Sequence, residues 1–396
     1  MNELGDWLAA EIYPQISLPK NGPDRNPGRA YRVKQIFKWL GRGVQSFDEM
    51  TNLPGDLREQ LAARAITGIP MIIAETRSPR DGTVKYGMKT FDGCVVESVL
   101  MRYRQGYSVC VSSQAGCRMG CAFCATKPQN FARHLSPGEM FGQVVVIARQ
   151  VAAAAGHITT NNGQGAAAAG QGAVGIGQVA ATAGHKNELP TKNRKAEAKG
   201  MPKIRNIVVM GVGEPFDNYD NTLKFIRLLH DHEETNIGYR RITISTCGIL
   251  PGILRLAEEG LPIGLAVSLH ASNDRVRSMI IPVNNRYSID KLIEGCKIYT
   301  YKTNRRVTFE YALMNGINDA PDDAIELLSR IRGMLCHVNL IPVNKTENTG
   351  FIPSSKEKIA RFGDILAKGG VQATVRRGLG TDIMAACGQL RNSMIE

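Results

Sequence analysis

Cys117-Arg118-Met119-Gly120-Cys121-Ala122-Phe123-Cys124 is the stretch that decides the fold, because it places three cysteines within eight residues. With the spacing C-x3-C-x2-C, three thiolates on one loop can wrap a single metal centre. Iron–sulfur cubanes are held by cysteine thiolates, and three ligands for four irons leave one iron open to a substrate. A zinc site needs a fourth ligand, for which His134 is the only nearby candidate. The spacing therefore favours an iron–sulfur cluster over a zinc site or over three core thiols that happen to be close.

Apolar runs alternate with helical patterns around this stretch, beginning near residue 107. The predicted strands are Tyr107–Val111, Ile204–Met210, Arg241–Thr246, Ile263–Leu269, Arg306–Leu313, His337–Ile341 and Val371–Val375, and helices are expected near 136–155, 222–231, 288–301, 320–333 and 355–368. Ser136, Pro137 and Glu139 supply the N-cap, first-turn proline and capping-box glutamate of the first of these helices. The alternation predicts an α/β fold with a parallel sheet, in a barrel or doubly wound, whose chemistry gathers at the C-terminal strand ends.

The first part of the chain, residues 1–75, predicts a small helical module instead. Four apolar side chains of the segment 30–40 fall on one helical face, with basic residues between them: Val33, Ile36, Phe37 and Leu40. A basic helix of this kind suits RNA, although an ordinary solvated face accounts for the pattern at least as well. We expect connecting strands at 76–106 and the α/β domain, with a C-terminal catalytic segment, at 107–396.

Residues 152–203 interrupt the alternation inside this domain. They begin with an Ala/Gly/Gln-rich run and end in the basic text KNRKAEAKGMPK. Such a composition cannot bury enough apolar surface to offset its ordering entropy, so we expect a disordered insertion. Its basic end could touch RNA, but an inert surface loop is the better interpretation.

The bulk properties fit an enzyme of ordinary size. The 396 residues suffice for one large domain and a smaller one, and the nine cysteines are too few and too unevenly spaced for a disulfide scaffold. A formal charge of +13 favours a polyanionic partner, or it serves solubility alone. No run approaches the roughly 20 apolar residues that span a bilayer, and the acidic N-terminus lacks the features of a signal peptide. We expect a cytoplasmic protein without a membrane partner.

The text around the three cysteines, Cys110-Val-Ser-Ser-Gln-Ala-Gly-Cys117 and onward to Cys124-Ala-Thr, closely resembles the RlmN/Cfr family of radical S-adenosylmethionine (SAM) 23S rRNA adenine methyltransferases. The resemblance covers nearly the whole chain outside the insertion, including the helical module. Its other motifs are Val96-Glu97-Ser98, Gly211-Val-Gly-Glu214-Pro215, Arg241-Ile-Thr-Ile-Ser245-Thr246, Ser268-Leu269-His270, Leu340-Ile-Pro-Val-Asn344 and Asp382-Ile-Met-Ala-Ala-Cys387-Gly388-Gln389-Leu390. It implies a partial (βα)6-type radical SAM barrel with a small N-terminal helical domain.

The same resemblance implies two cofactors and the residues that bind them. One [4Fe–4S] cluster per subunit would be held by Cys117, Cys121 and Cys124. SAM would be bound by Gly213, Glu214, Ser245, Ser268, Leu269, His270 and Asn344. By themselves these residues say less: Gly-Glu-Pro is typical of a tight turn after a strand, and a lone histidine is more often a satisfied core residue than a ligand.

Three further residues receive catalytic roles from the resemblance. Cys387 matches the cysteine that is methylated first, Cys110 its redox partner, and Glu97 the proton acceptor. One SAM would methylate Cys387, and a second would be cleaved at the cluster to activate that methyl group. A disulfide between the two cysteines would then remain. Without the family pattern, both cysteines would be interpreted as buried small hydrophobes. The other four, Cys94, Cys247, Cys296 and Cys336, match no role and are expected to pack.

The implied substrate is an unstacked adenosine of 23S rRNA, methylated at C2, together with the adenosine beside the tRNA anticodon. An electron donor of the flavodoxin or ferredoxin type and a monomeric protein complete the expectation. C8 methylation by the resistance-type branch is the nearest alternative, because both branches share the motifs and C2 is favoured on commonness. A radical SAM activase or ring-forming enzyme would lack the Cys110/Cys387 pair. A non-enzymatic iron–sulfur or zinc RNA-binding protein would rest on charge and cysteine spacing only.

Overall fold

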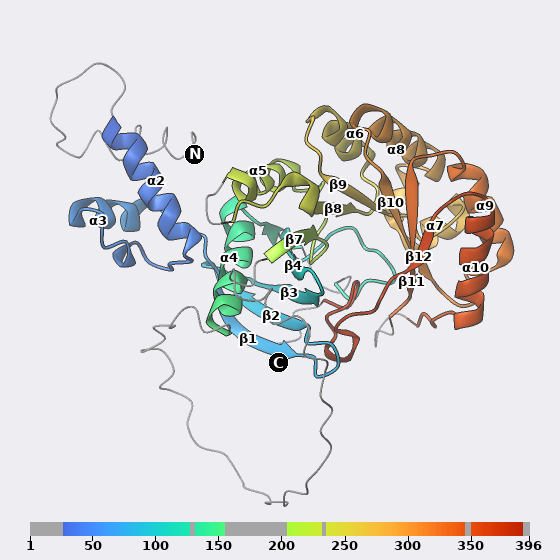
Figure 1. The fold of residues 1–396 in the computed structure, drawn as a ribbon, viewed down its shortest axis with the longest axis horizontal. Helices are drawn as coiled ribbons and strands as arrows, with labels where there is room; N and C mark the ends of the chain where they lie inside the picture. Colours follow the sequence, from blue (N-terminus) through green and yellow to red (C-terminus); the bar gives the residue numbers. More distant parts are fainter. Residues whose placement is uncertain (1–26, 127–130, 155–203, 232–234, 345–349, 391–396) are drawn as a thin grey trace, which may run out of the picture.

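The computed structural model describes residues 27–126, 131–154, 204–231, 235–344 and 350–390 (Figure 1). The helical module comes first, with α2 (Pro27–Gly41), the 3-10 helix η3 (Phe47–Glu49) and α3 (Gly55–Arg64). Its apolar residues form a small core of their own: Val33, Ile36, Val44, Phe47, Met50, Leu53, Leu57 and Leu61. The expected amphipathic face of α2 is therefore a packed face, with Val33 and Ile36 buried in that core.

A ten-stranded sheet forms the body of the molecule. In spatial order its strands are β1 (Met71–Arg77), β2 (Val84–Lys89), β3 (Val95–Tyr103), β4 (Gly106–Cys110), β7 (Ile204–Val209), β8 (Ile242–Thr246), β9 (Gly264–Ser268), β10 (Val307–Leu313), β11 (Cys336–Pro342) and β12 (Ala373–Val375). The pairs from β1 to β4 are antiparallel and those from β4 to β12 are parallel. Because β1 and β12 remain edges, the barrel is partial, as predicted. The two-stranded sheet of β5 (Gln114–Ala115) and β6 (Arg133–His134) stands apart.

Helices follow the outer side of the parallel strands, as α5, α6, α8, α9 and α10 do in Figure 1. Their bounds are α4 (Pro137–Ala154), α5 (Tyr219–Asp231), α6 (Leu250–Glu258), α7 (Asp274–Ile280), α8 (Ile289–Thr303), α9 (Pro321–Ile331) and α10 (Lys356–Lys368), with 3-10 turns η4 (Tyr239–Arg241), η5 (Pro282–Asn285) and η6 (Thr381–Ile383). All seven predicted strands and all five predicted helices of the α/β region are confirmed within a few residues. The main hydrophobic core lies between these helices and the sheet.

One element corrects the sequence prediction. The range 1–75, predicted as helical, holds no helix after Arg64 in the described residues, and β1 begins at Met71. Along β1 the side chains alternate between exposed and half-buried, so neither face carries the buried apolar row that marks a strand in a sequence. Backbone pairing with β2 holds this edge strand instead. The expected insertion at 152–203 lies outside the described residues, except for its first three residues, which end α4.

The C-terminal segment returns across the sheet and brings Cys387 to the cysteine loop. Ala125 N donates to Gly388 O (2.7 Å) and Thr126 Oγ1 to Leu390 O (2.7 Å). Ala385 and Leu390 pack in a small apolar cluster with Val99, Cys110 and Val212. Among the described residues, no helix combines the length and the apolar character needed to cross a bilayer.

Candidate active site

The three loop cysteines line one cavity with the C-terminal ends of the parallel strands, and we call it the cysteine cavity. Its walls carry most of the expected site residues: Cys117, Cys121, Cys124, Gly213, Glu214, Ser245, Ser268, His270, Asn344 and Cys387. Backbone bonds fix the loop at two points, since Ala122 N donates to Ile280 O (2.8 Å) and Ala125 N to Gly388 O (2.7 Å). The loop is thus held by the chain after α7 on one side and by the C-terminal segment on the other.

The donor set of this loop fits an iron–sulfur cluster, because cysteine thiolates are the ligands that hold cubane clusters. His134, the fourth ligand of the zinc alternative, bonds Gln114 instead, with 3.0 Å between Nδ1 and Nε2. Burial raises the pKa of Cys117 to about 12 and also raises the pKa of Cys124. A bound metal centre favours the thiolate, so binding would release protons here.

Gly213 and Glu214 leave the end of β7 in a conformation that packing dictates. Gly213 has φ +109°, and a Cβ there would lie 2.7 Å from Gln114 Cβ and 2.8 Å from Gln114 N, so only glycine fits. Phe216 N and Cys247 N donate to the two carboxylate oxygens of Glu214, at 3.0 and 2.7 Å. Burial is the main cause that raises the pKa of Glu214, and these backbone donors oppose it. The carboxylate therefore links the end of β7 to the end of β8 at the cavity wall.

His270 is buried at the end of β9 with φ +53°. Its Nδ1 accepts from Ala312 N (2.9 Å), and its ring meets that of Phe123 edge-on, 4.7 Å between centroids. Burial first and the charge of Arg277 second lower the pKa of His270 to about 3. The imidazole is therefore neutral at physiological pH, with its proton on Nε2. It can act as a hydrogen-bond donor to a ligand, but not as a cation.

Leu269, the neighbour of His270, does not line the cavity. Its side chain has no exposed surface and packs in the main core. Its backbone N donates to Glu310 O (3.0 Å). Any contact of Leu269 with a ligand would therefore involve its backbone carbonyl and not its side chain.

Three residues of this site were not found from the sequence. Cys247, expected only to pack, lines the cavity together with Cys121. Arg277 on α7 has no exposed surface and donates to the backbone oxygens of Cys247 (2.7 Å) and Ser268 (3.2 Å). Arg376, just after β12, also lines the cavity. In the sequence both arginines look like ordinary surface charges, and no local pattern distinguishes them.

Cys110 opens onto a second cavity, next to the first. This hairpin cavity, of about 180 Å³, lies between the hairpin β3–β4 and the C-terminal segment. The two cavities share Met210, Ile341, Asn344, Arg376 and Cys387. Burial first and then the nearby Cys387 raise the pKa of Cys110 to about 12, while Arg376 lowers it. Cys387, which is exposed, therefore borders both cavities, and Cys110 borders the second.

Glu97 lines neither cavity. Its side chain is fully buried, and Lys85 Nζ lies 3.3 Å from its Oε1. The same Nζ also donates to Met384 O (3.5 Å) in the C-terminal segment. Side chains alternate along a strand, so Glu97 shares its face of β3 with Val99, which does line the hairpin cavity. Glu97 thus lies on the same face of β3 as the residues that border this cavity, two positions before the first of them.

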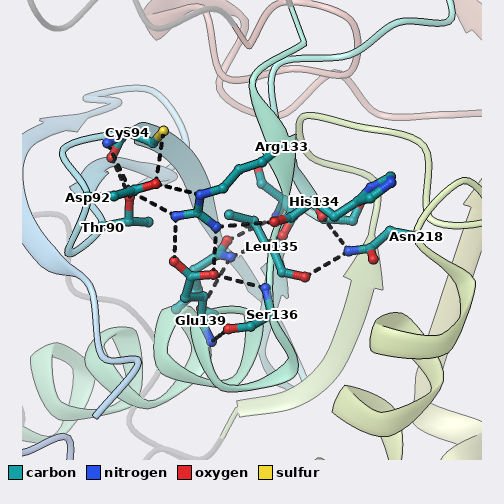
Figure 2. Close-up of polar contacts among 12 residues, drawn as sticks. Thr90, Asp92, Cys94, Arg133, His134, Leu135, Ser136, Glu139 and Asn218 are labelled. Carbon is teal, nitrogen blue, oxygen red and sulfur yellow. Dashed lines mark hydrogen bonds and ion pairs between the residues drawn. The ribbon is translucent and has the colours of Figure 1, made fainter. Parts of the chain in front are cut away.

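A polar network holds the start of α4 and lines neither cavity (Figure 2). The guanidinium of Arg133 donates to Asp92 (2.6 and 2.8 Å) in the β2–β3 turn and to Glu139 (2.9 and 2.8 Å) in the first turn of α4. Ser136 and Glu139 form the predicted capping box, with bonds of 3.2 and 2.9 Å. Asn218 donates to Leu135 O (2.8 Å), which holds the start of α5 against the same segment.

Two family models match the chain. Residues 111–328 match the radical SAM superfamily, and residues 27–67 match the ribosomal RNA large subunit methyltransferase N-terminal domain. The first range contains the three cysteines and most of the parallel sheet. The second is the helical module with its separate core.

Named relatives cover almost the whole chain. A Clostridium tetani protein named "Probable dual-specificity RNA methyltransferase RlmN" is 42% identical over 371 residues, which is 94% of this chain and 92% of that protein. A Desulforamulus reducens protein of the same name is 43% identical over 364 residues, 92% of this chain and 90% of that one. The crystal structure of a radical SAM methyltransferase from Sphaerobacter thermophilus matches with a TM-score of 0.78 and 41% identity, covering 99% of this chain and 97% of the other.

Proposed function

The chain belongs to the radical SAM superfamily and, within it, to the family of RlmN dual-specificity RNA methyltransferases, and from this premise we propose that it methylates C2 of adenosine in two RNAs. The substrates are an adenosine of 23S rRNA and the adenosine beside the tRNA anticodon. A [4Fe–4S] cluster and SAM are its cofactors. The observation that carries the proposal is the position of Cys387 at the boundary of the two cavities.

The cofactors belong to the cysteine cavity. Cys117, Cys121 and Cys124 would hold the cluster, and the remaining cavity wall offers the groups that suit SAM. Asn344 supplies a carboxamide, Ser245 and Ser268 supply hydroxyls, and Glu214 a buried carboxylate for an ammonium or a ribose hydroxyl. When bound, the cluster and SAM supply the methyl group and the one-electron chemistry that activates it.

Cys387 is the nucleophile of the first step, because a thiolate accepts a methyl group from a sulfonium by displacement. Arg376 lines both cavities together with Cys387, and the charge of Cys387 is the main cause that raises the pKa of the Arg376 guanidinium. Glu310 holds Arg376 in place with an ion pair of 3.3 Å, and Asn339 holds Glu310 in turn (3.0 Å). Arg376 is therefore a positioned cation next to the methyl-accepting sulfur.

Cys110 acts after the methyl carbon has joined the base. Its thiol gives up a proton and attacks the sulfur of Cys387, the bond between that sulfur and the transferred carbon breaks, and the electron pair of that bond takes up a proton to complete the methyl group of the product. The disulfide that forms needs two electrons from a reductant before the next turnover. Glu97 would accept the proton lost from the adenine ring from its place on β3, two residues before Val99, which lines the hairpin cavity. Lys85, 3.3 Å away, stabilises the ionised carboxylate that this role requires.

The partners follow from this chemistry. RNA is the macromolecular partner, and the exposed basic side chains of α2, Lys34 and Lys38, make the helical module its second point of contact. A flavodoxin or ferredoxin type of protein would supply the electrons. The enzyme would work as a monomer in the cytoplasm, where both RNAs are found.

The deciding experiment uses anaerobically reconstituted enzyme with SAM, a reductant and protein-free 23S rRNA. Digested nucleosides are compared by mass spectrometry with 2-methyl- and 8-methyladenosine standards. We expect 2-methyladenosine from the wild type and from the matched control Cys94→Ala, and none from Cys387→Ala. An 8-methyl product would keep the mechanism and overturn the position. Cleavage of SAM without either nucleoside would overturn the substrate.

A further inference from the structure

Cys387 lies in a tight turn of the C-terminal segment, residues 386–389. Gln389 N donates to Ala386 O (3.0 Å), which closes the turn with Cys387 at its second position. Gly388 follows with φ +80°, the left-handed conformation that the third position of a type II turn requires. The sulfur that accepts the methyl group in the proposed reaction is therefore carried by a turn of four residues, and its place depends on what holds that turn.

A closed loop, residues 380–385, comes directly before this turn, and we call it the support loop. Ala385 N donates to Gly380 O (2.9 Å) around the 3-10 helix η6. Met384 has φ +53°, an uncommon conformation for a residue other than glycine, which persists only where the surrounding structure holds it. Because no residue separates the support loop from the turn, a shift of the loop moves Cys387.

The turn between β1 and β2 holds the support loop through side-chain hydrogen bonds. Ser78 Oγ lies 2.9 Å from both carboxylate oxygens of Asp382, although the two residues are 304 positions apart in the sequence. Gly380 N donates to Asp81 Oδ2 (2.9 Å). Both bonds have a carboxylate as acceptor, and such bonds are stronger than those between neutral groups. A Cβ on Gly380 would lie 2.9 Å from Thr83 Cγ2, so the loop also packs directly against the turn.

Hydrogen bonds within the β1–β2 turn fix the two side chains that hold the support loop. Ser78 is buried, and its N donates to Thr83 O (2.8 Å). Thr83 N donates to Asp81 Oδ1 (2.8 Å), and Asp81 N donates to Ser78 Oγ (3.3 Å). The turn therefore offers a fixed position to the support loop.

A third contact links the support loop to the proposed proton acceptor. Lys85 of β2 donates from its Nζ to Met384 O (3.5 Å), and the same Nζ lies 3.3 Å from Glu97 Oε1. The proposed base and the methyl-accepting cysteine are thus both connected to β2 and to the turn before it.

Asp382 belongs to the C-terminal motif, but the site described above gives it no role. It lines neither the cysteine cavity nor the hairpin cavity, and both of its carboxylate oxygens accept from Ser78. A cofactor or base bound in these cavities would therefore not meet its carboxylate. Asp382 can act on the reaction only through the position of the segment that carries Cys387.

We propose that the β1–β2 turn positions Cys387 by fixing the support loop through Ser78 and Asp81. Asp382 is then a positioning residue. The assignment rests on the proposed function, because it takes Cys387 as the methyl acceptor. Placement matters for this sulfur in particular, since it must reach SAM in one step and Cys110 in a later one, and a misplacement of about 1 Å can cost a hundredfold in rate.

The test compares Asp382→Ala, Asp382→Asn, Ser78→Ala and the double variant Ser78→Ala/Asp382→Ala with Ser354→Ala. Ser354 is the matched control, because it is buried and its Oγ donates to Asp319 (2.8 Å) in the same kind of bond. Neither residue of that pair lines the two cavities. Asp382→Asn keeps an oxygen that can accept from Ser78 Oγ, so it separates the bond from the charge.

Three quantities are measured on each reconstituted full-length enzyme, after circular dichroism has confirmed its fold. The first is the rate of S-methylation of Cys387 by isotopically labelled SAM without RNA, scored by peptide mass spectrometry. The second is the rate of reductive SAM cleavage, which depends on the cofactor side alone. The third is the yield of the disulfide between Cys110 and Cys387 after limited oxidation with diamide, which reports the position of the sulfur without any methyl transfer.

Asp382→Ala and Ser78→Ala are expected to slow S-methylation about ten- to a hundredfold and to lower the disulfide yield, while SAM cleavage stays within about twofold of wild type. Asp382→Asn should stay within about threefold of wild type in all three quantities, because a neutral acceptor replaces a charged one in the same bond. The double variant should be no slower than the slower single variant, since the two residues share one interaction. Ser354→Ala should match wild type.

The contrary results can be told apart. Normal S-methylation and a normal disulfide yield in a folded Asp382→Ala enzyme would show that the turn does not position Cys387, with the methyltransferase assignment intact. SAM cleavage that falls in parallel with S-methylation would show a general loss of structure and would also contradict the positioning role. A wild-type enzyme whose Cys387 is never methylated would overturn the proposed function, and the disulfide yields would still test the position of the sulfur.

Discussion

At the scale of single residues, the site depends on a charged side chain that the folded chain buries completely. Arg277 has no exposed surface, and its guanidinium joins the backbone ends of β8 and β9 and the side chain of Asn284 (2.9 Å). Burial lowers the pKa of Arg277, and only a dense set of acceptors makes such a cation tolerable. Arg277 therefore supports the cysteine loop from α7. The loop is bound to the end of the same helix, because Ala122 N donates to Ile280 O.

Arg277→Met is expected to destabilise the protein by about 2–5 kcal/mol, because two buried carbonyls lose their donor. Urea unfolding followed by circular dichroism measures the change. Arg275→Met on the exposed side of α7 is the matched control and should cost less than about 0.5 kcal/mol. Equal stability of the two variants would show that this support is not required.

At the scale of elements, the start of α4 joins the antiparallel and parallel halves of the sheet. Arg133 connects the β2–β3 turn to the first turn of α4 through Asp92 and Glu139, of which Glu139 is almost fully buried (Figure 2). The Arg133 guanidinium is the main cause that holds the pKa of Asp92 well below its usual range. The capping box can be recognised in the sequence, because its two residues lie three positions apart. The ion pairs of Arg133 join the start of α4 to a turn that is distant in the sequence.

Arg133→Gln should lower stability at pH 7 by about 1–3 kcal/mol, because a buried carboxylate loses its partner. The sign of its pH dependence follows from Asp92, whose pKa is lowered in the folded state. The contribution of Asp92 is complete above about pH 4 and fades as the pH falls through the lowered pKa. Wild type and variant should therefore converge in acid. Arg227→Gln, which removes an exposed pair with Glu259, is the control and should cost at most about 1 kcal/mol. A difference that is constant from pH 7 to pH 3 would contradict the ion-pair account.

At the scale of the whole molecule, the proposed function requires the helical module and the α/β body, which have separate hydrophobic cores, to bind the same RNA. The helical module packs its own apolar residues, and Arg149 of α4 holds it by a bond to Gly43 O (2.6 Å). Lys34 and Lys38 lie one turn apart on α2, exposed and on the same side of the helix. The helical module contributes no residue to either cavity of the active site, so binding and chemistry can be separated experimentally.

The double variant Lys34→Gln/Lys38→Gln should reduce the salt slope of RNA binding by about two and weaken RNA affinity, because two phosphate contacts are lost. Reductive cleavage of SAM in the absence of RNA should stay at the wild-type level. The exposed pair Lys356 and Lys368 on α10, changed to glutamine in the same way, is the control. An unaltered salt slope would remove the module from the RNA-binding surface.

The sequence by itself determined what depends on neighbours along the chain. The spacing of Cys117, Cys121 and Cys124, the capping box at Ser136 and the strand–helix alternation from residue 107 are local patterns. The helices and strands that the last two predict are present. The motifs of the C-terminal segment and of the strand ends indicated the family for the same reason: each is a short contiguous stretch of residues.

Only the tertiary structure decided which distant residues meet. It placed Cys387 in the wall shared by two cavities and brought Cys247 into the same cavity wall as Cys121. It also buried Arg277 against the backbone of Cys247 and Ser268, and placed Glu97 on β3 two residues before Val99, which lines the hairpin cavity. None of these has a local signal, because a buried arginine and a solvated one have the same sequence pattern. The edge strand β1 was missed for a related reason: backbone pairing with β2 holds it, and pairing leaves no trace in a residue pattern.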